Sequence, residues 1–165
     1  MLSLLPSPVH RMVLRTAHAL RLRWWRLTKR TVRGCSVIAI DAQGRILLVR
    51  HSYHARDTWM LPGGGLGRDE NLLSAAVREL AEETGCVLTE AAHIGSVTLD
   101  RSGWTNLIEV ICGRAEGTPA PDGREIEEAR FFAPDALPER TSGPTHQMIA
   151  KWQDYKAKLQ NGNSA

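Results

Sequence analysis

Residues 62–86, PGGGLGRDENLLSAAVRELAEETGC, form the stretch of this sequence that decides the fold. Three consecutive glycines and a further one at Gly67 make a loop without bulky side chains, so its backbone N–H and C=O groups can approach a ligand closely. Apolar residues then recur at helical spacing, and Gly85 follows as a residue that readily takes the left-handed conformation past a helix end. The stretch therefore predicts a glycine loop and then a helix over Leu72–Thr84.

Three glutamates share one side of the predicted helix. Glu79, Glu82 and Glu83 stand at positions i, i+3 and i+4, which places them in one sector about 100° wide beside the apolar sector. Like charges at these spacings repel one another, so a cation should compensate them. Magnesium prefers a few carboxylates plus water and phosphate oxygens, and Arg78 offers a fixed positive charge next to Glu79. A glutamate-rich helix face usually only contacts solvent. Here the three glutamates occur together with the glycine loop and Glu70, and this combination favours a metal site.

The overall composition is that of one soluble globular domain. The chain has 165 residues, of which 42% are hydrophobic and 24% charged, and it contains no apolar run long enough to span a membrane. Cys35, Cys86 and Cys112 lie far apart, each beside apolar residues, which gives no support to a disulfide framework or a cysteine zinc site. We expect buried thiols in a reducing, cytoplasmic compartment.

A basic arm precedes an acidic body. Eight of the 21 Lys and Arg residues fall at or before Arg33, whereas the first acid is Asp41. Apolar residues of the arm recur at steps of three and four, and they are Val9, Val13, Ala17, Leu20, Trp24 and Leu27. Residues 1–33 are therefore predicted to form a basic amphipathic helical arm.

This arm has several interpretations, which stay open at the level of sequence. Its apolar stripe could pack on the body of the domain or on a second subunit in a homodimer. Residues 1–30 also have the acid-free, Arg-rich character of an organelle-targeting segment, which is the alternative to a cytoplasmic location. Contact of the arm with nucleic acid or an anionic membrane is a further and less favoured alternative.

The remainder of the chain, residues 34–160, is predicted to be one α/β domain. Short runs rich in Val, Ile and Leu predict two hairpins and a later strand, at residues 35–40, 46–49, 94–99, 104–112 and 129–132. A further helix is expected from Pro144 toward Leu159, and residues 161–165 are expected to be a disordered tail. Strand pairs interleaved with helices indicate a mixed sheet.

The stretch that begins at Gly64 and ends at Cys86 resembles the signature of a known family. Gly64, five residues, Glu70, seven residues and then residues 78–85 match the Nudix box, G-x5-E-x7-R-E-U-x-E-E-x-G-U, at every charged and glycine position. The resemblance to Nudix hydrolases covers about residues 34–158. It implies a Nudix fold, in which an α/β/α sandwich surrounds a mixed β-sheet. It also implies metal-dependent hydrolysis of a pyrophosphate bond in a nucleoside diphosphate linked to another group.

The resemblance further implies roles for individual residues. The ligands of Mg²⁺ or Mn²⁺ would be Glu79, Glu82, Glu83, Glu70 and the backbone carbonyl near Gly64. Arg78 would fix a catalytic glutamate, and Glu82 is the first choice for the base or metal ligand. The catalytic set is therefore Glu82, Glu79 and Arg78.

Residues for the substrate are predicted from side-chain chemistry. Arginine pairs with phosphates, which favours Arg68 inside the glycine loop and Arg50 upstream of it. Aromatic rings stack on bases, which favours Tyr53 and Trp104. His51 is expected to be a surface residue without a role. The partner would be a nucleotide-type small molecule, with nucleoside triphosphates and nucleotide sugars included.

The chemistry leaves two matters open. A carboxylate from a distant loop can take the proton from water in place of a box glutamate, and Asp100, Glu125 and Glu128 are the acids available for that. The alternative function is a non-catalytic, nucleotide-sensing Nudix domain whose basic arm binds nucleic acid, membrane or a partner. The complete box favours the enzyme, because a binding module has no need of every catalytic carboxylate.

Overall fold

The computed structural model of the chain describes residues 31–52, 57–67, 69–101, 103–121 and 125–162. The strands and helices in these ranges are, in chain order, β1 (Thr31–Ile40), β2 (Ile46–His51), α2 (Leu72–Thr84), β3 (Val87–Arg101), β4 (Trp104–Glu116), β5 (Ile126–Phe132) and α3 (Gly143–Gly162). Residues 1–30 of the arm lie outside the described residues, as do Tyr53 and Arg68. The predictions made for them stay predictions.

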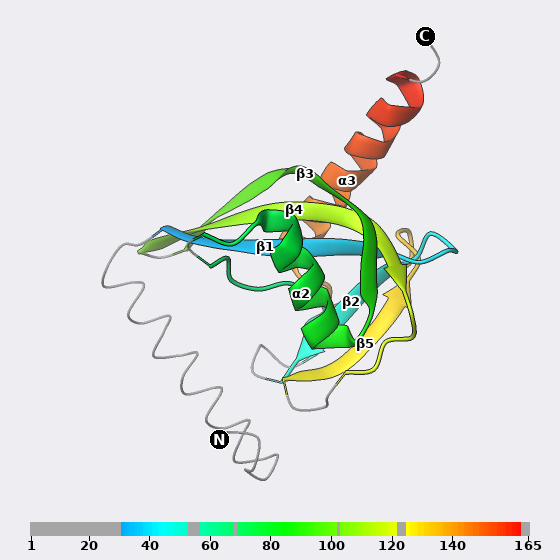
Figure 1. Cartoon of the computed structure of the whole chain (residues 1–165), viewed down its shortest axis with the longest axis horizontal. Helices are drawn as coiled ribbons and strands as arrows, with labels where there is room; N and C mark the ends of the chain where they lie inside the picture. The colour runs from blue at the N-terminus through cyan, green and yellow to red at the C-terminus, as the bar shows by residue number, and fades with distance from the viewer. Residues whose placement is uncertain (1–30, 53–56, 68, 102, 122–124, 163–165) are drawn as a thin grey trace.

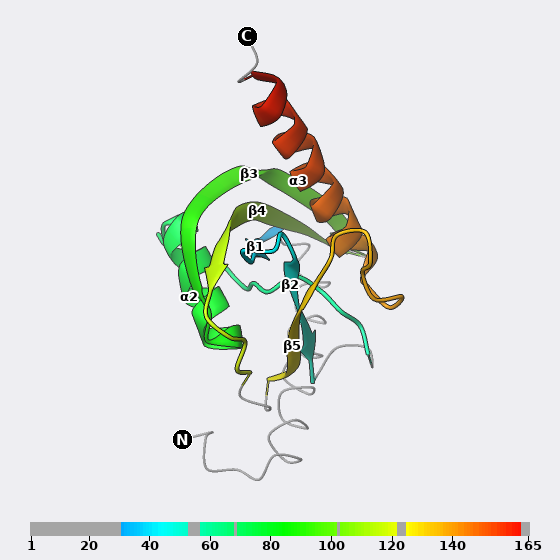
Figure 2. The same cartoon turned by 90° about the vertical axis from the view of Figure 1, so that its right-hand side faces the viewer.

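The strands form one mixed sheet in the order β3-β4-β1-β2-β5. β1 and β4 run parallel, and the other neighbouring strands run antiparallel. Figure 1 shows α2 lying across one face of the sheet, and Figure 2 shows α3 on the opposite side. The predicted α/β/α sandwich around a mixed sheet is confirmed.

Each face of the sheet has its own apolar core. Side chains alternate along a strand, so neighbouring residues of β1 enter different cores. Val37 packs in the core that contains Ala76 and Leu80 of α2, whereas Ile38 packs in the core that contains Trp152 of α3. Because β1 and β2 are covered on both faces, their sequences are nearly continuous apolar runs, which is why they were predictable.

The glycine loop lies between β1 and β2. These two strands pair close to their connecting turn, and a segment of irregular backbone separates them further along. In this segment Met60 exchanges backbone hydrogen bonds with Val49 of β2, and the carbonyl of Gly64 accepts the N–H of Cys35 of β1 at 2.9 Å. The loop is therefore held against the sheet by backbone bonds to both strands.

Several elements extend beyond their predicted ranges. β1 begins at Thr31, inside the segment assigned to the arm, because Thr31 pairs with Thr105 of β4. β3 begins at Val87 and β4 ends at Glu116 because these two residues pair with each other. α3 continues through Gly162, inside the segment expected to be a disordered tail. No helix in the described part of the chain is long and apolar enough to cross a membrane.

The ends of α2 follow from two capping residues. Asn71 precedes the helix, and its side-chain oxygen accepts from backbone N–H groups of the first turn. Gly85 follows the helix at φ 71°, in the left-handed region, and donates its N–H to the carbonyl of Ala81. The predicted helix Leu72–Thr84 and its glycine stop are confirmed.

Gly85→Ala should destabilise the protein by about 1–2 kcal/mol, because a side chain carries a cost of that size in the left-handed region. The effect is one of backbone conformation, since an added Cβ would meet nothing closer than 3.9 Å. Gly143→Ala is the control, because a Cβ at that glycine would have nothing within 4 Å and its φ is not positive. Urea unfolding followed by circular dichroism measures both variants. Equal midpoints for Gly85→Ala and the parent would contradict this account of the helix end.

Candidate active site

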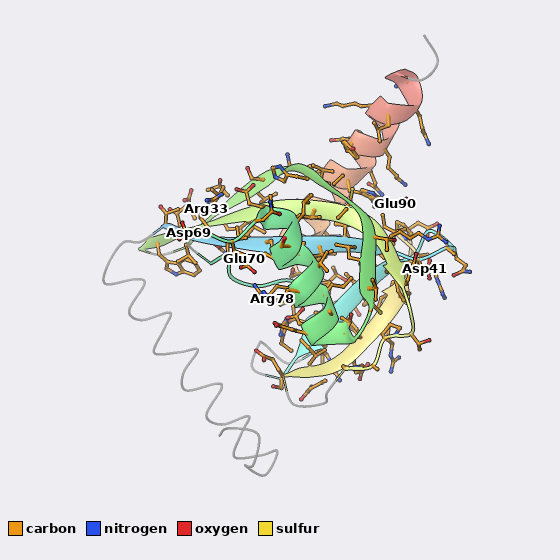
Figure 3. All side chains as sticks on the ribbon, viewed as in Figure 1. Arg33, Asp41, Asp69, Glu70, Arg78 and Glu90 are labelled. Atoms are coloured by element: carbon orange, nitrogen blue, oxygen red, sulfur yellow. The ribbon has the colours of Figure 1, made fainter. Side chains whose placement is uncertain are left out.

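Arg78 is the centre of a carboxylate cluster on α2. Its Nε and Nη2 donate to the two oxygens of Glu70 at 2.9 and 3.1 Å. Its Nη1 donates to Glu79 at 2.9 Å and to Glu82 at 3.2 Å. Figure 3 shows Glu70 and Arg78 on the same side of the helix. The structure thus brings one guanidinium between the carboxylates that the sequence singles out.

These contacts shift the pKa values of the groups involved. Hydrogen bonds from Arg78 hold the pKa of Glu70 below its usual value, and a bond from the N–H of Gly67 lowers it further. Burial raises the pKa of Glu79, and the hydrogen bond from Arg78 opposes that rise. The pKa of Arg78 is itself raised by its bonds to Glu70 and Glu79. Arg78 therefore stays charged and keeps Glu70 ionised.

Glu83 is held by a backbone group. Its Oε2 accepts the N–H of Gly63 at 3.0 Å. Burial raises the pKa of this carboxyl to about 8, and the neighbouring Glu79, Glu125 and Glu82 add to the rise, while the bond from Gly63 opposes it. Near neutral pH, and without a cation, Glu83 therefore carries a proton.

Two glycines make room for this arrangement. An ideal Cβ at Gly64 would lie 2.4 Å from Oε1 of Glu79, and one at Gly63 would lie 2.2 Å from the carbonyl oxygen of Cys35. The carbonyl of Gly64 is predicted to bind a metal, and in the structure it accepts the N–H of Cys35 at 2.9 Å. A carbonyl has two lone pairs, so that bond leaves one for a further ligand. Gly64 therefore lets the carboxylate of Glu79 lie directly against the loop backbone, and Gly63 lets the loop lie against β1.

The donors around α2 suit a hard divalent cation. Carboxylate oxygens are the ligands that Mg²⁺ and Mn²⁺ prefer. Because Gly64 has no side chain, the carboxylate of Glu79 lies close to the loop backbone, whose carbonyl oxygens are also suitable ligands. Within residues 31–162, apart from the gaps in the description, no group of three or more His, Cys, Asp or Glu side chains is arranged to hold a metal ion. In this arrangement Glu79 and Glu82 both accept hydrogen bonds from Nη1 of Arg78. The residues predicted to hold a cation are Glu79, Glu82, Glu83, Glu70 and the carbonyl of Gly64, and of these Glu70 has both oxygens bonded to Arg78.

The predicted substrate residues Arg50 and Trp104 are not part of this cluster. Arg50 forms ion pairs with Asp57, Glu127 and Glu128, so a phosphate would have to replace a carboxylate on its guanidinium. Trp104 begins β4 at the tip of the β3–β4 hairpin. By the alternation along that strand it falls on the face of the sheet that packs against α3, opposite α2.

The structure brings two further residues to Glu83. His51, expected on the surface, is instead buried at the end of β2, with its Nε2 3.7 Å from Oε1 of Glu83. Glu125 lies close by, since its carbonyl accepts the N–H of Ser52 at 2.9 Å and its charge raises the pKa of Glu83. The sequence signal for His51 is the two-residue period of β2, which places it on the same face as the buried Leu47 and Val49.

The match to family models agrees with this geometry. The model of the NUDIX domain matches residues 30–153. The chain belongs to the Nudix family. Its Nudix box is the glycine loop and helix α2 described above, with Arg78 among the box carboxylates.

Named relatives share the Nudix domain with this chain. The NAD-capped RNA hydrolase NudC of Vibrio atlanticus is 28% identical over 109 residues, which cover 64% of this chain and 39% of NudC. The ADPR responsive transcriptional repressor NtrR of Acinetobacter baylyi is 38% identical over 77 residues, which cover 42% of this chain and 31% of NtrR. The chain thus spans about two fifths of the length of the NudC proteins that it matches.

Solved structures of Nudix proteins have the same architecture. The crystal structure of a MutT NUDIX hydrolase from Burkholderia pseudomallei superposes with a TM-score of 0.66 at 28% identity. The superposition covers 73% of this chain and 97% of that one. The predicted Nudix fold is confirmed.

Gly64→Ala should weaken Mn²⁺ binding on the order of tenfold while leaving the melting temperature close to that of the parent. The added Cβ would overlap the carboxylate of Glu79, which is the flexible end of a side chain and can move away from the loop. Gly65→Ala is the matched control, because a Cβ there would have nothing within 4 Å. Electron paramagnetic resonance measures free Mn²⁺ in titrations of each protein. Equal Mn²⁺ affinities for the two variants would show that the approach of Glu79 to the loop does not contribute to metal binding.

Glu83→Gln should stabilise the metal-free protein near neutral pH. The folded pKa of about 8 exceeds the usual value of 4.5, so the carboxyl contributes its full stability only below about pH 4.5 and loses it as pH rises toward 8. A neutral amide has no such loss. The difference in melting temperature between variant and parent, measured in EDTA, should therefore grow from about pH 5 to about pH 8.

Glu116→Gln is the control for that measurement, because Glu116 is an exposed acid at the end of β4 and is not among the groups that shift the pKa of Glu83. The difference between its melting temperature and that of the parent should not grow over the same pH range. A constant difference between Glu83→Gln and the parent at every pH would contradict the raised pKa of Glu83.

Proposed function

We propose that this chain hydrolyses a pyrophosphate bond in a nucleoside diphosphate linked to another group, with Mg²⁺ or Mn²⁺ as cofactor. The observation that supports this most is the burial of two box carboxyls, Glu79 and Glu83, whose side chains are only 14% and 11% exposed. Burying neighbouring acids raises their pKa values and costs stability, and such groups gather at functional sites. Membership of the Nudix family supplies the chemistry that this cluster performs with a cation.

The residues of the box hold and orient the reacting groups. Glu79, Glu82 and Glu83 would bind the cation, which supplies neutralisation of charge on the phosphate oxygens and lowers the pKa of water. Arg78 orients Glu79 and Glu82, and both oxygens of Glu70 hold the guanidinium from the other side. Because a guanidinium is a planar fork with fixed donor directions, this set of contacts fixes the direction of each carboxylate.

A carboxylate must take the proton of the attacking water. Glu82 is the first choice within the box, because its side chain is largely exposed and water can reach it. Of the three acids considered outside the box, Glu125 is the one whose charge acts on Glu83. Asp100 lies at the tip of the β3–β4 hairpin, and Glu128 is paired with arginine. Glu125 is therefore the second choice for the base.

The names of the relatives support a substrate that joins a nucleoside to a diphosphate. NudC is named an NAD-capped RNA hydrolase, and the Burkholderia protein is named a MutT NUDIX hydrolase. A pyrophosphate bond beside a nucleoside is common to NAD and to nucleoside triphosphates. We therefore propose a substrate class that contains nucleoside triphosphates, dinucleotides, nucleotide sugars and capped RNA ends.

Glu82→Gln should lower turnover on the order of a hundredfold while the fold is retained, since the amide removes a charged metal ligand with little change of volume. A panel drawn from the substrate class, assayed with Mg²⁺ for release of phosphate or nucleoside monophosphate, identifies the compound on which this is measured. Glu116→Gln is the matched control, because Glu116 is an exposed acid at the end of β4. Turnover of Glu82→Gln within about twofold of the parent at saturating Mg²⁺ would contradict the role of Glu82 as a ligand or base.

A nucleotide-sensing role is the second candidate. NtrR is named as an ADPR responsive repressor, and its identity to this chain is 38% over 77 residues. Calorimetric titration with ADP-ribose, followed by product analysis of the same sample, separates the two functions. Saturable binding without product from any compound of the panel favours sensing, and product release favours the hydrolase.

A further inference from the structure

The carboxylate of Glu83 is approached from two sides by other elements. Its Oε2 accepts the N–H of Gly63 at 3.0 Å, and its Oε1 lies 3.7 Å from Nε2 of His51. Both side chains are almost fully buried, with 5% of His51 and 11% of Glu83 exposed. The glycine loop thus fixes one oxygen of this box glutamate, and the end of β2 faces the other.

Strand pairing fixes the position of the His51 ring. His51 is the last residue of β2, where it pairs with Ile126 of β5 just after a shift in register from Arg50. The next residue, Ser52, donates its N–H to the carbonyl of Glu125 at 2.9 Å. A side chain on a strand that pairs with a neighbouring strand is positioned more precisely than a side chain on a loop. Strand pairing therefore holds the backbone of His51 beside Glu83.

We infer that His51 is a positioning residue for Glu83, whose ring directs the Oε1 side of that carboxylate when the site holds a divalent cation. The inference rests on the proposed function, in which Glu83 is a metal ligand. A separation of 3.7 Å is too long for a hydrogen bond. In the tautomer that carries its proton on Nε2, an approach of about half an ångström by the carboxylate would make Nε2–H a donor to Oε1. Groups that orient ligating carboxylates in this way commonly change metal affinity by about 10–100-fold when they are removed.

A second histidine–glutamate pair in the same protein provides a matched control. Nε2 of His93, on β3, lies 3.0 Å from Oε2 of Glu109, on β4, and Arg33 binds the other oxygen of Glu109 at 3.0 Å. Glu109 is not part of the Nudix box. This contact is shorter than that of His51, but the His93 side chain is 43% exposed. His93→Asn therefore controls for the loss of a histidine–glutamate contact outside the box, and the comparison of His51→Asn with His51→Gln controls for a change at a buried position.

The experiment compares His51→Gln, His51→Asn and His93→Asn in the full chain. The amide nitrogen of glutamine can reach the position of Nε2, whereas that of asparagine reaches only the position of Nδ1. Mn²⁺ affinity without substrate is measured by electron paramagnetic resonance, and the Mg²⁺ concentration for half-maximal turnover is measured beside the KM for substrate. Near-ultraviolet circular dichroism checks that each variant keeps its tertiary structure.

We expect His51→Asn to weaken Mn²⁺ binding about tenfold or more, and to raise the Mg²⁺ requirement with little change in the KM for substrate. His51→Gln should stay within about threefold of the parent, and His93→Asn should match it. Equal Mn²⁺ affinities for His51→Asn and His51→Gln, whether weakened or not, would overturn the inference, because the place of the donor would then be irrelevant. A parent that turns over the panel with Mg²⁺ while His51→Asn binds Mn²⁺ normally overturns this inference alone. A parent that neither binds Mn²⁺ nor releases product overturns the proposed function as well.

Discussion

Repulsion among the acids of the Nudix box is the constraint on which the rest of the site depends. Arg78 offsets it for Glu70, Glu79 and Glu82, since one guanidinium donates to all three carboxylates. Glu83 receives a single backbone N–H and is the most deeply buried of the box acids, so its pKa rises to about 8. Repulsion on the outer side of α2 is therefore reduced by the guanidinium of Arg78, and where the helix meets the loop it is reduced by the proton that Glu83 keeps. In the proposed function a cation would replace the proton of Glu83 on that side.

The sheet provides the surroundings of that side. β1 and β2 separate beyond their turn, and the glycine loop fills the space between them through bonds such as that from Cys35 to Gly64. Because the loop carries no bulky side chain there, Glu79 and Glu83 can lie against its backbone. The end of β2 and the start of β5 then close the site with His51 and Glu125. Three separate parts of the chain thus meet at the end of one helix.

The parts of this arrangement that depend on near neighbours were predictable. The bounds of α2 follow from Asn71, Gly85 and the apolar period between them, and the glutamates share a sector because of their spacing alone. The start of β1 was not predictable, because Thr31 is a strand residue only through its pairing with Thr105 of β4. The ion pairs of Arg50 and the burial of His51 have the same origin, since both depend on β5, which lies far along the chain. Residues close together in the sequence determine where α2 begins and ends and which side of it carries the glutamates. Strand partners far along the chain determine which side chains are buried.

Arg78 and the proton of Glu83 have different consequences for cation binding. Arg78 competes with a cation for Glu79 and Glu82, but Glu70 holds two of its nitrogens, so the guanidinium can release one carboxylate without leaving the helix. Glu83 has no such competitor, but it carries a proton near neutral pH that must leave before the carboxylate can bind a metal. In the proposed function a divalent cation would therefore have to displace the proton of Glu83 and one carboxylate bond of Arg78, and its second positive charge doubles its Coulomb attraction to each carboxylate relative to a monovalent ion at the same distance.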